Sequence, residues 1–199
     1  MKRPKLLSLR PCQFVLGMRE VEAKIQKMRK MTARKLADYA RAHVIPVVVG
    51  PHEDLYVIDH HHFARACWEL DFGGYEVDVL KDLSDLQESK FWNEMVRRDW
   101  VYLNDQFGFG PHSPSALPVD IRCLADDPFR SLVWEVIEQG AIQKAKTPFF
   151  EFKWAAFFRL NLDVRLHSKS NFRSAVEQAV KLARSKASDH LPGFVGKKR

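Results

Sequence analysis

The chain has 199 residues and a mass of 23.1 kDa, the size of one domain or of one domain with an extension. Hydrophobic residues make up 46% of it and aromatic residues 12%, which excludes a disordered or low-complexity polymer. The formal net charge of +7 is uneven: residues 1–35 hold eleven basic and two acidic side chains, residues 36–164 hold twelve and twenty-one, and residues 165–199 hold nine and two. Basic ends suit phosphate-bearing partners, although they also occur as plain soluble surfaces.

Cysteine spacing and hydropathy indicate the cellular setting. Cys12, Cys67 and Cys123 are widely spaced and form no Cys-x-x-Cys pair, which favours a reducing compartment. Ser8 and Arg10 interrupt the basic N-terminus before a secretory apolar core could form, and no stretch approaches the roughly 20 apolar residues of a membrane span. We therefore expect a cytoplasmic protein with no membrane segment.

The first half of the chain is predicted to combine short strands with helices. A strand is expected at Leu6–Leu9, followed by two helices between Arg19 and Ala42, the second of them capped by Thr32. The other expected elements of this half are strands at Val47–Val49, Leu55–Ile58 and Tyr75–Leu80 and a helix over Phe63–Leu70.

The second half is predicted to be helical after a loop. Ser84 is expected to cap a helix over residues 86–98, and the glycines and prolines between Val101 and Asp120 indicate the loop. The later helices are expected from Pro128 with an acidic cap at Asp126-Asp127, from Phe149 to Leu162, and from Phe172 to Lys186 with Ser170 as its cap, before a basic tail Lys197–Arg199. The fold class is thus α+β: a small mixed-sheet domain over residues 1–83, with an α-helical extension over residues 84–199 packed on it.

The strongest local signal is the run Asp59-His60-His61-His62, which lies where a strand is followed by a helix. A helix start has unpaired amides and a positive dipole end, so it attracts phosphate. Histidines there can donate to phosphate oxygens or move protons. Asp59 could orient a histidine, bind a ribose hydroxyl or hold a metal. The simpler alternative is that Asp59 only caps the helix.

An aspartate followed by histidines also suggests a metal site, because carboxylate and imidazole are ligands of Zn and Mn. Phosphoesterases built on that triplet need further aspartates upstream, whereas this chain has only Asp38 in a predicted helix and Asp54 in a predicted turn. We therefore expect no metal site. The aromatic residues between Phe149 and Phe158 fall largely on one helical face, which favours core packing over base stacking.

The approach to the first helix is a second and weaker candidate site. Gly17 lets backbone come close to a ligand, and Gln13, Arg19 and Lys24 could contact its base or its phosphates. The alternative is that the two basic residues belong to an ordinary solvated helix face. Five further histidines share no spacing and are given no role: His43, His52, His112, His167 and His190.

The order of these features resembles the ParB-like nuclease family within the ParB/sulfiredoxin superfamily. The resemblance is carried by Leu9-Arg10-Pro11-x-Gln13, Val15-x-Gly17-x-x-Glu20-Val21-x-x-Lys24, Ile45–Val49 and Tyr56–His62. Residues 124–132 and 148–155 are similar to segments of the helical half of the same family, so the resemblance covers residues 6–162. Its most specific part is the Asp-His-His-His block.

The resemblance implies a small α/β fold in which the loop between a strand and the next helix binds nucleotide phosphates. It implies CTP binding as in chromosome-partitioning ParB, ATP-dependent chemistry as in sulfiredoxin, or phosphate transfer as in the free-serine kinases. Asp59, His61 and His62 match the Asp-Gly-His-His-Arg motif of the kinase-like branch. The departures are His60 in place of the glycine and Phe63 in place of the arginine, with Arg65 two places later. Gln13 also stands where that branch has an acid, and Glu20 is the candidate replacement.

We therefore expect a protein that binds a nucleotide or another phosphate ligand, with Mg and ATP or CTP as the implied cofactors. Any catalysis would be phosphoryl transfer or phosphohydrolysis. The catalytic candidates are Asp59, His61, His62 and Glu20, and the binding candidates are His60, His61, His62, Arg65, Gln13, Gly17, Arg19 and Lys24. The alternatives are a DNA-binding or DNA-cleaving protein, although the chain has no helix-turn-helix signature, and a non-enzymatic adaptor.

Overall fold

The computed structural model describes residues 4–164, 166 and 169–196. It confirms the α+β class, with a small mixed sheet and several helices. Contacts within the chain divide it into two compact units, Met1–Asp126 and Asp127–Arg199. In the described part of the chain, no helix has both the length and the apolar character that crossing a bilayer requires.

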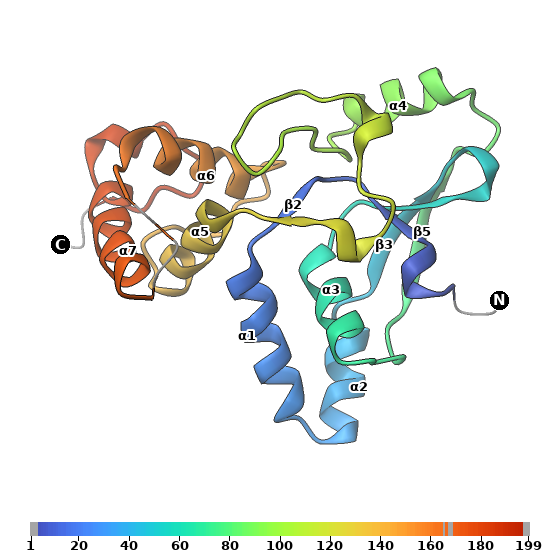
Figure 1. Cartoon of the computed structure of the whole chain (residues 1–199), viewed down its shortest axis with the longest axis horizontal. Coiled ribbons are helices and arrows are strands. Elements are labelled where there is room, and N and C mark those ends of the chain that lie inside the picture. Colours follow the sequence, from blue (N-terminus) through green and yellow to red (C-terminus); the bar gives the residue numbers. More distant parts are fainter. Residues whose placement is uncertain (1–3, 165, 167–168, 197–199) are drawn as a thin grey trace. The chain divides into compact units, whose positions relative to one another are not determined.

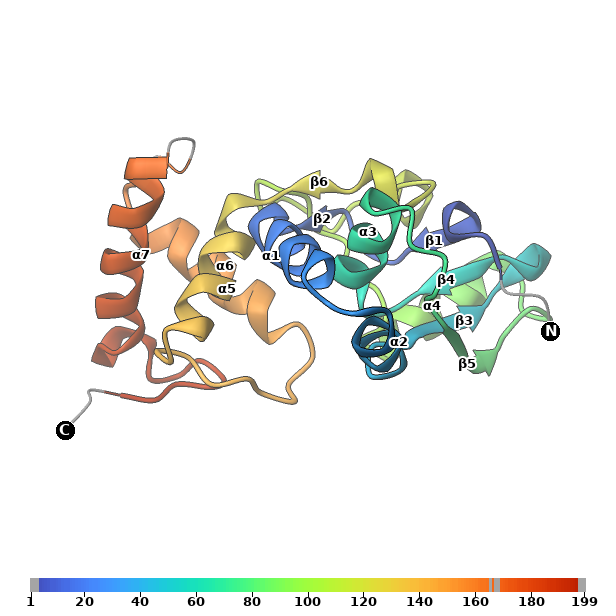
Figure 2. The ribbon, with the colours of Figure 1, turned by 90° about the horizontal axis from the view of Figure 1, so that it is seen from below.

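The first unit is built on a four-stranded sheet in the order β1-β4-β3-β5 (Figures 1 and 2). Its strands are β1 (Leu9–Pro11), β3 (Ile45–Val49), β4 (Leu55–Val57) and β5 (Val77–Asp82). β3 and β4 are antiparallel, whereas β1 pairs with β4, and β5 with β3, in parallel. The sheet is therefore mixed, as the sequence predicted.

The strand predicted at Leu6–Leu9 is wrong over most of its length. Leu6–Ser8 form a turn of 3-10 helix, because the amide and the hydroxyl of Ser8 both donate to the Lys5 carbonyl, the hydroxyl at 2.7 Å. Only Leu9–Pro11 pairs with β4. A proline is tolerated in this strand because β1 lies at the edge of the sheet.

Helices cover both faces of this sheet. They are α1 (Met18–Arg29), α2 (Ala33–Arg41), α3 (His61–Glu69) and α4 (Glu88–Arg97). Val47 of β3 belongs to one buried cluster with Phe63 of α3, whereas its neighbour Val48 belongs to another with Phe91 and Met95 of α4. Successive residues of a strand point to opposite faces, so α3 and α4 lie on opposite sides of the sheet. The boundary expected after residue 83 falls inside the first unit, since α4 packs on the sheet.

Helix caps were predicted at two positions in this unit, Thr32 and Ser84. Thr32 caps α2 as predicted, because its side-chain oxygen accepts a hydrogen bond from the Lys35 amide at 3.4 Å. Ser84 does not cap α4. Its amide donates to the Asp82 carboxylate at 3.0 Å in a turn, and α4 begins only after Gln87.

A second, two-stranded sheet fixes the start of α1. β2 (Val15–Leu16) pairs in parallel with β6 (Ala125–Asp126), and Leu16 lies opposite Asp126. α1 begins directly after this strand, with Gly17 as its N-cap residue. It packs side by side with α3 (Figure 1). The last residues of the first unit thus return to the place where α1 starts.

The second unit consists of three helices around one apolar cluster. They are α5 (Pro128–Glu138), α6 (Phe150–Asn161) and α7 (Lys169–Ala183). Trp154 and Phe158 of α6 are fully buried in that cluster. The aromatic run is therefore core packing, as predicted.

The predicted starts of the helices in the second unit have different outcomes. Asp127 caps α5 as predicted, since its carboxylate accepts from the Phe129 amide at 2.9 Å. α7 begins at Lys169, before the expected Phe172, so Ser170 lies inside the helix rather than at its cap. The predicted basic tail Lys197–Arg199 lies outside the described residues.

Candidate functional site

The histidine run lies at the start of α3, as predicted. β4 ends at Val57 and α3 begins at His61, so Asp59 and His60 belong to the connection between them. His60 is the N-cap residue and has a left-handed backbone, with φ +60° and ψ +25°. Glycine adopts this conformation without the strain that a side chain brings. The backbone at this position therefore suits the glycine of the Asp-Gly-His-His-Arg motif, and His60 carries strain there.

Two hydrogen bonds hold His60 in this conformation. Its amide donates to Asp59 Oδ1 at 2.6 Å, and its ring Nδ1 donates to the Val44 carbonyl at 2.7 Å. A carbonyl oxygen only accepts, so Nδ1 carries the proton and Nε2 of the neutral ring has a lone pair. Asp59 itself is exposed, and its Oδ1 atom stabilises the turn by accepting the hydrogen bond from the His60 amide.

Substitution of His60 should expose the backbone strain. His60→Gly and His60→Ala both lose the ring hydrogen bond, but only the alanine variant keeps a side chain at φ +60°. We expect His60→Ala to be less stable than His60→Gly by about 1 kcal/mol, measured by urea denaturation. Equal stability of the two variants would show that the left-handed conformation costs nothing at this position.

His61 is a core residue and exposes only 4% of its surface. Burial lowers the pKa of its ring to about 3, with Asp59 and a hydrogen bond to the Val57 backbone acting in the opposite direction, so the ring is neutral near pH 7. Its Nε2 is buried and has no hydrogen-bond partner. The structure thus places His61 in the core rather than at the surface where a phosphate would bind.

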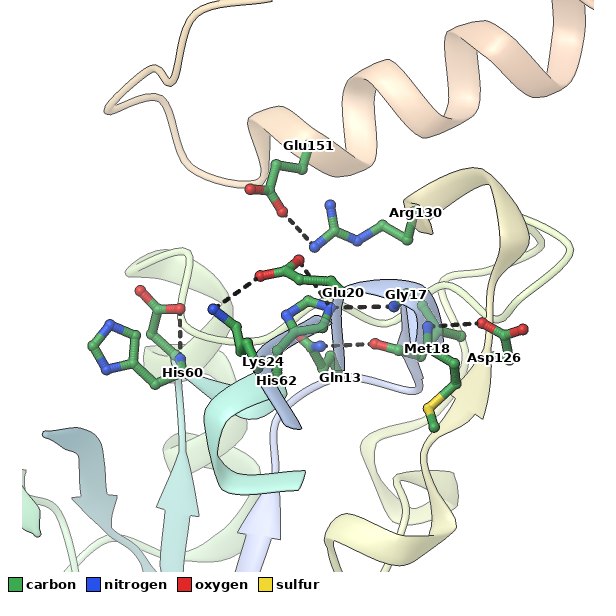
Figure 3. A network of polar contacts seen from close by, with 12 residues as sticks. Gln13, Gly17, Met18, Glu20, Lys24, His60, His62, Asp126, Arg130 and Glu151 are labelled. Carbon is green, nitrogen blue, oxygen red and sulfur yellow. Dashed lines mark hydrogen bonds and ion pairs between the residues drawn. The ribbon is translucent and has the colours of Figure 1, made fainter. Parts of the chain in front are cut away.

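His62 is the histidine that faces α1 (Figure 3). Its Nε2 lies 3.2 Å from the Gly17 amide nitrogen and 3.4 Å from Glu20 Oε2. The other carboxylate oxygen of Glu20 lies 3.3 Å from Lys24 Nζ. The histidine run and the approach to the first helix, which the sequence offers as two motifs of one expected site, thus lie together at His62. Gly17, Glu20, Lys24 and His62 are called the helix-start cluster below.

The Gly17 amide and the Glu20 carboxylate require opposite protonation states of His62 Nε2. The Gly17 amide can only donate, so it needs an unprotonated Nε2, whereas the Glu20 carboxylate can only accept from a protonated one. A proton taken up at Nε2 therefore exchanges the bond with Gly17 for a bond with Glu20. This geometry suits a histidine that accepts a proton and is then stabilised as a cation by a carboxylate.

Both helix starts can attract anions. The N-cap residues of α1 and α3 make no side-chain cap, and a helix start carries unpaired amides and a positive dipole end. A carboxylate already lies at the start of α1, because Asp126 Oδ1 accepts a hydrogen bond from the Met18 amide at 3.0 Å. Met18 directly precedes Arg19 in this helix. This role of Asp126 could not be predicted from the sequence, because only the pairing of β6 with β2 brings Asp126 to the start of α1.

Gln13 and Arg65 support the fold next to the helix-start cluster. Gln13 is buried, and its side-chain nitrogen donates to a backbone carbonyl two residues later at 2.7 Å. Arg65 donates to Glu69 at 2.8 Å and to the carbonyls of Ile121 and Arg122. The structure thus gives both side chains packing and hydrogen-bonding partners of their own.

Metal-ligating side chains do not gather at this site. Among the described residues, no group of three or more histidine, cysteine, aspartate or glutamate side chains could hold a metal ion. Mg²⁺ in nucleotide sites is commonly held by one or two carboxylates together with the phosphates of the ligand. The described side chains thus form no complete Mg²⁺ site of their own.

A family model described as "Putative ParB-like nuclease" matches residues 3–160. The chain belongs to this ParB-like family. The matched range contains the whole helix-start cluster of this ParB-like protein and ends within α6. The crystal structure of protein Atu1540 from Agrobacterium tumefaciens is similar to it, with 36% identity and a TM-score of 0.86 over 99% of this chain and 98% of that one. A search of curated proteins finds no match.

Proposed function

We propose that this ParB-like protein binds a nucleotide or another phosphate-bearing ligand where α1 and α3 begin. The observation that carries the proposal is the hydrogen bond from the Gly17 amide to His62 Nε2, because it joins two helix starts that lack side-chain caps. Two positive dipole ends attract one phosphate group more strongly than a single end does. Lys24 adds a cation in the same cluster.

Phosphoryl transfer or hydrolysis is the reaction that the helix-start cluster supports best. Such a reaction needs positive charge around the phosphate and a group that takes the proton of the attacking hydroxyl or water. Lys24 and the helix starts supply the charge, and His62 with Glu20 supplies the proton acceptor. His61 has no part in this proposal, because its ring is buried and neutral. Nucleotides are abundant in the cytoplasm, which is where we place this function.

Calorimetric titration tests the proposal. The full chain is titrated with ATP, CTP, ADP and GTP, each with and without Mg²⁺, at two temperatures so that a vanishing enthalpy cannot conceal binding. We expect saturable heat with at least one nucleotide, and dependence on Mg²⁺ if the metal enters with the ligand phosphates. The absence of heat under every condition would overturn the proposal.

Nucleic-acid binding is a second candidate, favoured by the charge of α1 and α2. Residues 18–41, which form these two helices and their connection, hold eight lysines and arginines and three acidic residues. Lys27, Lys30, Arg34 and Lys35 of this segment are exposed. Basic surfaces neutralise nucleic-acid phosphates and release counterions, so such binding weakens steeply with salt.

Replacing Arg34 and Lys35 together by glutamine should weaken the binding of duplex DNA of random sequence. If both side chains contact phosphates, the slope of log affinity against log salt should become shallower by about 2. Fluorescence anisotropy over a salt series measures it. The matched control replaces Lys144 and Lys146, exposed residues of the second unit, by glutamine. Equal losses in the two double variants, or no binding by the wild type, would remove this candidate.

A further inference from the structure

The last strand of the four-stranded sheet has a neighbour on one side only. β5 lies at the end of the strand order β1-β4-β3-β5, and among the described residues only β3 pairs with it (Figure 2). Two adjacent apolar side chains of β5 face solvent, since Val79 is 47% exposed and Leu80 is 50% exposed. The edge of the sheet therefore offers backbone hydrogen-bonding groups beside an apolar pair, a combination that favours pairing with another strand.

A bulge in β5 brings an aspartate and a lysine to the same face of the sheet. Pro46 of β3 lies opposite Asp78. Val48, two residues later in β3, lies opposite Lys81, which is three residues later in β5, so Leu80 is an extra residue without a partner in β3. Residues two apart in a strand point to the same face, and the residues opposite them do so as well. Asp78 and Lys81 therefore share a face, which in a regular strand their spacing of three would prevent.

Two backbone hydrogen bonds fix which groups of β5 face β3. A β3 amide donates to the Glu76 carbonyl at 2.9 Å, and the Leu83 amide donates to a β3 carbonyl at 2.8 Å. In a parallel pair, the residues that bond to the neighbouring strand alternate with residues that do not. Val77 and Asp82, each adjacent to one of these bonded residues, therefore turn their backbone N–H and C=O groups away from β3, toward the open edge.

One antiparallel register makes two copies of β5 complementary. It opposes an acid to a base on one face, an apolar residue to an apolar residue at the centre, and two residues with outward backbone groups: the pairs are Asp78 with Lys81, Val79 with Leu80, and Val77 with Asp82. Because the arrangement is two-fold symmetric, each pair occurs twice. A shift of one residue in either direction opposes Asp82 to Asp78 or to Glu76, and like charges directly opposite each other destabilise a sheet.

We infer that two copies of this chain associate through β5 in this register and join their sheets into one. The inference goes beyond the proposed ligand binding and does not depend on it. A second copy is the partner because β5 matches itself in charge, in the face of each side chain and in the direction of its backbone groups. Lys81, which as a lone edge lysine would discourage strand pairing, meets Asp78 of the other copy. The contact is small, so the dimer dissociates on dilution.

Sedimentation velocity of the full chain over about 1 µM to 1 mM tests the association. We expect the dimer fraction to rise with concentration. Asp78→Lys and Lys81→Asp should each weaken the dimer by about tenfold or more, because each opposes like charges twice. The double variant that carries both substitutions restores opposite charges and should return the affinity to within about threefold of the wild type. Lys90→Asp, at an exposed position of α4, is the matched control and should leave the dimer unchanged.

Cysteine cross-linking measures the register. The exposed Cys123 is first replaced by serine, whereas the other two cysteines are buried. A mixture of an Asp78→Cys chain and a Lys81→Cys chain should form a disulfide-linked dimer on oxidation, because directly opposed residues have Cα atoms about 4.5–5.5 Å apart. Either chain alone should cross-link at least about tenfold more slowly, because its two cysteines would lie roughly 10 Å apart along the strands.

Three outcomes would overturn the inference. They are a monomer at every concentration, a dimer that the single charge reversals leave intact or the double variant does not restore, and equal cross-linking in the mixed and the separate chains. Thermal unfolding checks the fold of each variant. If the double variant does not fold, the cross-linking result decides, since it needs only one substitution in β5 of each chain.

Discussion

Replacing Glu20 by glutamine should tighten nucleotide binding and stop turnover at the same time. The Glu20 carboxylate lies 3.3 Å from Lys24 Nζ and 3.4 Å from His62 Nε2, so it repels an incoming phosphate and competes with it for the lysine (Figure 3). Glutamine keeps the size of the side chain and removes the charge. We expect the affinity for ATP to rise about tenfold, from the Coulomb energy of one charge at a partly exposed site.

The same substitution removes the carboxylate that, in the proposed function, stabilises a protonated His62. Loss of a general base or of the carboxylate that supports it lowers rates by about 100-fold or more. His62→Ala should behave differently, because it removes both the hydrogen bond that joins the two helix starts and the proton acceptor, so affinity and turnover both fall. If Glu20 served only to hold the Lys24 side chain in place, replacing Glu20 would instead weaken nucleotide binding. The sign of the change in affinity therefore distinguishes the two roles.

Titration with ATP and a phosphate-release assay measure the two effects on the same preparations. Glu22→Gln is the matched control, because Glu22 lies on the same helix and is exposed. Weaker binding by Glu20→Gln would contradict the repulsion argument. Unchanged phosphate release would remove Glu20 from the reaction, and a wild type that binds ATP without releasing phosphate would limit the helix-start cluster to binding.

The location of the site could be predicted from the sequence, because it follows from local patterns. β-branched residues before Asp59 and an apolar helical stripe after His62 are enough to place the histidine run between a strand and a helix. The choice among the three histidines could not be predicted. Consecutive residues of a helix point about 100° apart, so the packing of α3 against the sheet decides that His61 is buried and that His62 faces α1.

The partners of that site depend on contacts between distant segments. Asp126 reaches the Met18 amide only because β6 pairs with β2, and those strands have two residues each, too few for a periodic pattern. His43 lies near His60 because α2 ends where β3 begins, and no spacing in the sequence relates the two histidines. The domain boundary expected after residue 83 marks the place where predicted strands are followed by predicted helices. In the structure Phe91 and Met95 pack α4 onto the sheet, so α4 belongs to the first unit.

The other large expected effect is on the stability of the three-helix unit. Asp127 caps α5, and its carboxylate also accepts from Arg159 of α6 at 2.7 Å, with only 3% of its side chain exposed. The guanidinium of Arg159 lies 4.9 Å from the ring of Phe129, so methionine can replace its packing but not its charge. Arg159→Met leaves a buried carboxylate without its ion-pair partner, while the hydrogen bond from the Phe129 amide remains. We expect it to lower the free energy of unfolding of this unit by about 3 kcal/mol near neutral pH.

The pH dependence of that loss identifies its cause. Burial raises the pKa of Asp127 and the charge of Arg159 lowers it, so removing the arginine raises that pKa further. A carboxyl with a raised pKa in the folded state takes up a proton more readily when folded than when unfolded. The stability of the three-helix unit that depends on this carboxyl is therefore retained at low pH, and it is lost as the pH rises through the folded-state pKa of Asp127. The deficit of Arg159→Met should accordingly shrink as the pH falls from 7 toward 4.

Hydrogen exchange of the α5 and α6 amides measures this unit separately from the sheet domain, which need not unfold with it. Lys153→Met, at an exposed position of α6, controls for loss of a positive charge from the same helix. Adding Asp127→Asn to Arg159→Met should recover much of the stability at pH 7, because asparagine caps a helix without a charge. A deficit that is the same at pH 4 and pH 7, and that Asp127→Asn does not relieve, would mean that lost packing against Phe129 causes the instability rather than an unpaired carboxylate.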